Sequence, residues 1–113
     1  MRYEPQYERF QAPGPDGAVF AIEFKKAGFL AAGDQPELYF FSVNGSEVVV
    51  GVSGQTLRQF QRGRRYLSRE EKIDVAGLRL KRQIEAGAAL RSENLFIGDR
   101  ELEALVQELS LPA

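Results

Sequence analysis

The sequence predicts a single α+β domain, in which a small antiparallel sheet of three or four strands is followed by two or three helices packed on one face. The chain has 113 residues, close to the commonest size of one domain. Residues 1–52 are β-rich and residues 53–113 are helical in pattern, and this order favours α+β over alternating βαβ units. An Asn-Gly pair between two alternating apolar runs marks a central hairpin over residues 37–52.

The hairpin is the strongest local signal in the chain. Asn44 and Gly45 tolerate the positive φ angles of a type I′ turn, and a two-residue loop pairs Val43 with Ser46. This register gives one almost wholly apolar face, which is expected to look inward: Tyr39, Phe41, Val43, Val48, Val50 and Val52. The other face carries Leu38, Phe40, Ser42, Glu47 and Val49.

Two further strands are predicted before the hairpin. Residues 18–24 alternate, with apolar side chains on one side. A turn cluster at residues 13–17 precedes them, and residues 7–12 are the candidate partner strand. Residues 28–36 contain Gly, Asp and Pro and are expected to form a loop.

The second half begins with two capped helices. Ser53 is a suitable N-cap for a short helix that ends at Gly63. Ser68 and Glu71 form a capping-box pattern, which predicts a longer helix to about Ala86.

A brief extended piece and a last helix complete the chain. Residues 94–97 are expected to be extended, and Asp99 is expected to cap the helix that follows. That helix carries one apolar stripe with i, i+3, i+4, i+7 spacing: Leu102, Leu105, Val106 and Leu109.

The longer helix has apolar residues on two sides. One arc holds Ile73, Gly77, Leu80 and Ile84, while Val75 and Leu78 lie nearly opposite. Two apolar sides indicate either burial on both sides or docking of one side on a second chain. For the second alternative, a symmetric self-association surface is expected from Val75, Leu78, Arg79 and Arg82.

The composition argues against an enzyme. Cysteine and histidine are absent, which excludes disulfides, thiolate zinc sites, thiol nucleophiles and the usual neutral-pH proton carrier. We therefore expect no catalytic residue, metal or cofactor. No apolar signal core and no membrane-length apolar run is found, so a cytoplasmic location without membrane association is expected.

Charge is concentrated in the middle of the chain. Residues 58–82 hold nine basic and three acidic side chains, although the whole chain has a net charge of −1. Arginines on a helix and its preceding loop can neutralise phosphates, and Tyr66 could stack on a base. The candidate contacts are Arg58, Arg62, Arg64, Arg65, Arg69 and Lys72. The favoured alternative is a solvated face, partly paired with nearby acids and with the acidic last helix.

Two smaller patterns have structural explanations that we favour. Glu70 and Asp74 share a helix face that suits a hard cation, but acids are expected in a first helical turn. The turn at residues 51–56 resembles an anion-binding strand-to-helix turn without its lysine, so a capped helix start is favoured.

Residues 38–105 are similar in layout to a family of short bacterial domains of unknown function. The similarity rests on the strand pair, residues 52–57 at a helix start, a helix over residues 76–87 and Asp99 before the last segment. It implies one compact domain and no functional residue. The sequence thus predicts a non-catalytic interaction domain with a protein partner or a second copy. The alternative is a nucleic-acid-binding module that uses residues 58–82.

Overall fold

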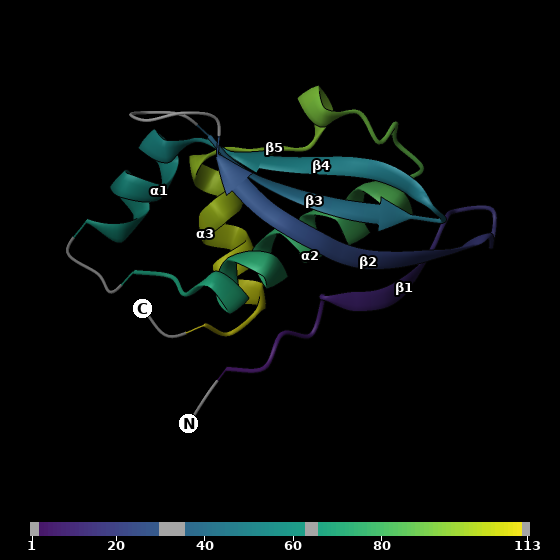
Figure 1. Cartoon of the computed structure of the whole chain (residues 1–113), viewed down its shortest axis with the longest axis horizontal. Coiled ribbons are helices and arrows are strands. Elements are labelled where there is room, and N and C mark those ends of the chain that lie inside the picture. Colours follow the sequence, from purple (N-terminus) through teal and green to yellow (C-terminus); the bar gives the residue numbers. More distant parts are fainter. Residues whose placement is uncertain (1–2, 30–35, 63–65, 112–113) are drawn as a thin grey trace.

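The computed structural model describes residues 3–29, 36–62 and 66–111, and it confirms an α+β architecture (Figure 1). One sheet contains five strands in chain order: β1 (Arg9–Pro13), β2 (Val19–Phe29), β3 (Glu37–Val43), β4 (Ser46–Val52) and β5 (Phe96–Ile97). The helices are α1 (Gly54–Gln61), α2 (Arg69–Glu85) and α3 (Asp99–Glu108), and a 3-10 turn, η1 (Ser92–Asn94), precedes β5.

The sheet has one strand more than predicted, and it is mixed. Strands β1 to β4 form an antiparallel meander, whereas β5 lies parallel to β4. The extended piece expected at residues 94–97 is a strand only at Phe96 and Ile97, because Asn94 ends the 3-10 turn and Leu95 caps it. A strand of two residues is too short to show an alternating sequence pattern. Strand β5 is recognised only because Phe96 pairs with Gly51 and Ile97 pairs with Val52.

The hairpin forms in the predicted register. Val43 pairs with Ser46, and Asn44 and Gly45 have φ angles of 49° and 87°. The side-chain oxygen of Asn44 also accepts the backbone N–H of Ala21 at 2.9 Å, which ties the turn to β2. All six side chains expected to look inward are buried: Tyr39, Phe41, Val43, Val48, Val50 and Val52.

Strand β2 is longer than the sequence indicated. It continues through Gly28 and Phe29, so the predicted loop over residues 28–36 is wrong at its first two positions. The register with β3 shifts between Phe24 and Lys26, which marks a bulge. A bulge interrupts strict alternation, and this is why the pattern faded after residue 24.

The first two helices begin where the sequence placed them. Ser53 Oγ accepts the N–H of Thr56 at 3.0 Å, and Ser68 forms a reciprocal capping box with Glu71. Helix α1 ends with Arg62 as its C-cap, and the predicted stop at Gly63 lies outside the described residues. Helix α2 ends before Gly87, whose φ angle is 70°.

Asp99 does not cap α3. Gly98 is the N-cap, and its N–H donates to Glu101 Oε1 at 3.3 Å. Asp99 is the first helical residue, and its carboxylate accepts the hydroxyl of Thr56 at 2.6 Å. This bond joins the starts of α1 and α3, so Asp99 acts between helices rather than within one.

Both apolar sides of α2 are buried inside the single chain. The helix packs against β1, β2, β4 and α3. Val75 and Leu78 are only 3% and 1% exposed. Their predicted role in self-association is therefore wrong, and the alternative of burial on both sides accounts for them.

Candidate interaction surfaces

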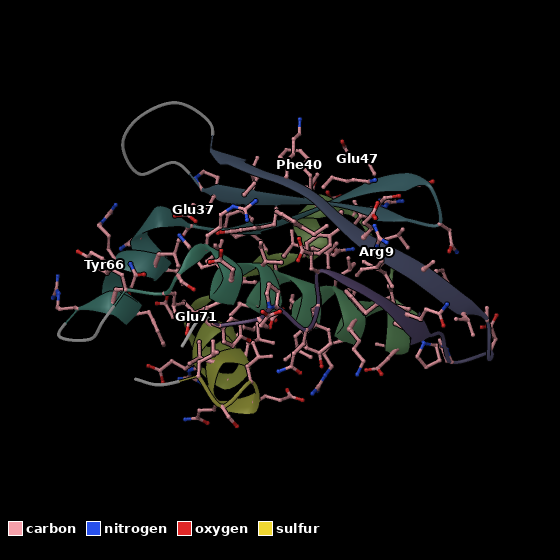
Figure 2. All side chains as sticks on the ribbon, turned by 60° about the horizontal axis from the view of Figure 1, so that its bottom comes forward. Arg9, Glu37, Phe40, Glu47, Tyr66 and Glu71 are labelled. Atoms are coloured by element: carbon pink, nitrogen blue, oxygen red, sulfur yellow. The ribbon has the colours of Figure 1, made fainter. Side chains whose placement is uncertain are left out.

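One face of the sheet is partly apolar, and the described parts of the chain leave it uncovered. The helices lie on the opposite side, and Figure 2 shows Phe40 and Glu47 on the side turned away from them. Leu38, Phe40 and Val49 alternate with buried neighbours and are partly exposed, while Phe96 on β5 is 44% exposed. Phe40 pairs with Val49, and Gly51 pairs with both Leu38 and Phe96. We call Leu38, Phe40, Val49 and Phe96 the apolar strip.

Gly51 leaves room for the ring of Phe96, the most exposed member of the apolar strip. A Cβ atom on Gly51 would lie 3.0 Å from two ring carbons of Phe96 and 3.4 Å from Leu38 Cδ2. The Phe96 ring therefore rests on the backbone of β4 beside Leu38. Phe96 was not predicted as a surface residue, although the sequence shows both an aromatic residue in an extended piece and a glycine in a strand.

Charged residues border the apolar strip on the same face. The next cross-strand row contains Glu47, Glu23 and Arg9, and the Lys26 ammonium lies 4.9 Å from the centre of the Phe40 ring. Hydrogen bonds from Lys25 and then from Arg9 hold the pKa of the Glu23 carboxyl below its ordinary value. The open face is thus divided into an apolar end and a charged middle.

The second half of the basic segment is largely paired. Arg79 Nε lies 2.9 Å from Glu101 Oε2, and Arg82 forms an ion pair with Glu108. This is the predicted pairing with the acidic last helix. Lys81 lies 3.4 Å from Glu85, and Lys72 lies 3.0 Å from Glu37. Lys72, a predicted phosphate contact, is therefore engaged with β3.

The described residues of the first half of the basic segment lie at the end of α1 and at the start of α2. Arg58, Arg62 and Arg69 are exposed, and Tyr66 is 76% exposed. The Arg69 guanidinium lies 5.5 Å from the centre of the Phe24 ring. Arg64 and Arg65 lie outside the described residues. Ten residues of helix, about 15 Å, separate Arg69 from Arg79 along α2, so the described basic residues of this helix form two groups.

A half-buried ion pair, joined by a tyrosine hydroxyl, links β3 to α2. Glu37 Oε1 accepts the Tyr39 hydroxyl at 2.6 Å and the Lys72 ammonium at 3.0 Å. Burial, followed by the hydrogen bond to Glu37, raises the pKa of Tyr39 well above its ordinary value. These side chains satisfy one another, so we assign them a structural role.

Asp74 does not form a cation site with Glu70. It is fully buried and accepts the backbone N–H groups of Gln6 and Tyr7 at 2.9 and 2.8 Å, together with the Tyr3 hydroxyl. We call residues 3–8 the N-terminal strap. Among the described residues, no group of three or more acidic side chains is arranged to hold a metal.

The sequence could not show this role for Asp74, because its main partners are backbone groups that are 67 and 68 positions away along the chain. Burial, followed by the hydrogen bond to Asp74, raises the pKa of Tyr3. The N-terminal strap is therefore part of the folded domain.

Comparison of the chain with protein-family models, with curated proteins and with solved structures gives no match. The similarity to a bacterial family of unknown function stays a prediction. Of the helices in the described ranges, none is both long enough and apolar enough to cross a bilayer.

Proposed function

We propose that the chain is a non-catalytic interaction domain that associates with a second copy of itself through the apolar strip. The observation that carries the proposal is a sheet with one covered face and one open face, whose apolar end includes the rings of Phe40 and Phe96. Burying such rings releases water from apolar surface, and two sheets readily pack face to face.

The charges beside the apolar strip support a second copy as the partner. Lys26 lies on the β2 side of Phe40, and Glu47 lies on β4. Consider two copies stacked with their open faces together and related by a two-fold axis that runs parallel to the strands. This axis places the β2 side of one copy, with Lys26, opposite the β4 side of the other copy, with Glu47. The same surface patch thus supplies both halves of the contact.

Sedimentation equilibrium of the purified chain tests this proposal. We expect a species of twice 12.7 kDa that becomes a monomer in Phe96→Glu. Val19→Glu is the matched control. Val19 is 59% exposed, and it lies at the start of β2, far from the end of this strand that pairs beside the apolar strip. A monomer at high micromolar concentration, or a dimer that persists in Phe96→Glu, would contradict the proposal.

A second candidate function is nucleic-acid binding by the exposed basic end near Arg58, Arg62, Tyr66 and Arg69. The exposure of these four side chains favours this end. The mechanism requires affinity for DNA or RNA that falls steeply with salt.

Titration of labelled single- and double-stranded DNA and RNA, at low and physiological salt, tests the second candidate. Binding should weaken in Arg62→Glu and Arg69→Glu but not in Arg82→Glu, whose cation is paired with Glu108. Absence of binding at low salt would remove this function.

A further inference from the structure

Part of β2 has no partner strand on one side. Strand β1 pairs with β2 only from Pro13 opposite Val19 to Arg9 opposite Glu23, and the N–H of Phe24 donates to Glu8 O at 2.7 Å. Beyond this point β2 continues over residues 25–29, paired with β3 on its other side. Among the described residues, no strand pairs with residues 25–29 on the β1 side.

The N-terminal strap explains this free edge. Instead of continuing along β2, the chain before β1 turns toward α2, where Asp74 accepts the N–H groups of Gln6 and Tyr7. Gly77 allows a close approach, because a Cβ atom there would lie 2.5 Å from Tyr7 Cβ. The same contacts that anchor the strap leave the edge of β2 open.

Basic side chains flank the free edge. Lys25 is bonded to Glu23 yet its side chain is 56% exposed, and Lys26 lies on the open face beside Phe40. Arg69 is exposed near Phe24, at the start of the same edge. A second copy paired at this edge would bring two sets of these cations together, which is unfavourable. An acidic strand suits the edge better.

We infer that the free edge of β2, residues 25–29, accepts an extended acidic segment of a partner protein by strand addition. The unpaired N–H and C=O groups of an edge strand supply the hydrogen bonds, and the flanking cations select for acidic side chains. The backbone edge of β2 is distinct from the apolar strip, although Lys26 borders both, so the inference goes beyond the proposed self-association. Lysines on an edge strand also prevent unwanted strand pairing. The competing explanation is that Lys25 and Lys26 serve only to keep other strands away from this edge.

A labelled peptide of alternating glutamate and valine is the probe. Fluorescence anisotropy at low salt should show binding of this peptide and not of its lysine–valine counterpart. In the bound state, amide hydrogen exchange should slow at those residues of 25–29 whose N–H groups point away from β3. Lack of binding, equal binding of the two peptides, or unchanged exchange at residues 25–29 would overturn the inference.

Two further measurements separate strand addition from simple charge attraction. A glutamate–valine peptide with alternate backbone N-methyl groups keeps its charges but loses hydrogen bonds, so it should not bind. Replacing Lys25 and Lys26 together by Glu should weaken binding of the unmodified peptide about tenfold. Lys81→Glu, on α2, is the matched control and should bind as the parent chain does.

Phe96→Glu distinguishes this inference from the proposed self-association. It should abolish dimer formation and leave peptide binding unchanged, because Phe96 lies on β5 at the opposite edge of the sheet. Loss of peptide binding in Phe96→Glu would overturn the assignment to the β2 edge, whatever the oligomeric state.

Discussion

The two faces of the sheet are built from the same residue types but have opposite environments. Phe41 and Val50 are fully buried on the face that α2 covers. Their chain neighbours Phe40 and Val49 point the other way and remain partly exposed. Whether a side chain of β3 or β4 is buried therefore depends on whether it faces α2. Its own hydrophobicity does not decide its burial.

The open face itself has two different parts. Open faces of antiparallel sheets usually carry polar residues, whereas here one end of the open face is apolar. The charged middle, with Glu23 bonded to Lys25, shows the usual pattern only a few residues away. From this contrast within one face we propose that another molecule covers the apolar strip.

The largest expected effect is a direct test of the two faces. Phe41→Ala should lower the free energy of unfolding by about 3–5 kcal/mol, because it leaves a cavity under α2. Phe40→Ala should lower it by about 1 kcal/mol or less, because its ring already meets solvent. Urea unfolding of both variants as monomers gives the comparison, and equal losses would show that the outer face is covered in the isolated chain.

The next largest effect concerns the N-terminal strap. Asp74→Ala removes the acceptor for two backbone N–H groups and for the Tyr3 hydroxyl, so we expect a loss of about 3 kcal/mol. Glu85→Ala is the control, because its ion pair with Lys81 lies on the helix surface and should be worth less than about 0.5 kcal/mol. Rapid amide exchange at Gln6 and Tyr7 should accompany the loss in Asp74→Ala, and protection that persists there would contradict the role given to Asp74.

Two glycines provide a smaller contrast between the faces. Gly77→Ala should destabilise by about 1–3 kcal/mol despite the better helix propensity of Ala, because its Cβ would lie 2.7 Å from Tyr7 O. Gly51→Ala meets only the exposed Phe96 ring and the end of the Leu38 side chain, which have room to move, so its cost should be smaller. Thermal unfolding of both variants measures the difference, and the reverse order would show that the strap yields more easily than the ring.

The sequence predicted features that depend on neighbouring residues. The type I′ turn at Asn44, the Ser68 capping box and the αL residue Gly87 follow from local chemistry, and all three are present. Alternation then assigned the inner face of the hairpin correctly. Such signals lie within a few positions of one another along the chain.

Features that depend on distant contacts could not be predicted. The short strand β5 exists because Phe96 meets Gly51, and the role of Asp74 depends on backbone groups of Gln6 and Tyr7. Val75 and Leu78 looked like a surface because the sequence does not show that α2 is covered on both sides. The apolar strip and the β2 edge became visible only once the helices were placed.

The smallest expected effect is a pH dependence that arises from Tyr39 on the covered face. Burial and the hydrogen bond to Glu37 raise the pKa of Tyr39 above its ordinary value of about 10. Above that pH an unfolded tyrosine loses its proton while folded Tyr39 keeps it, so ionisation favours the unfolded state. The contribution of Tyr39 to stability is therefore full below about pH 10 and falls by up to about 1.4 kcal/mol for each further pH unit.

Urea unfolding between pH 9 and 11 measures this slope. Tyr39→Phe should reduce the alkaline slope, although it also loses the hydrogen bond to Glu37 and so begins from a lower stability. Absorbance at the tyrosinate band should show Tyr39 ionising only as the chain unfolds. If Tyr39 instead ionises in the folded chain near pH 10, then the inner face is open to solvent at β3, and the contrast between the two faces fails at this position.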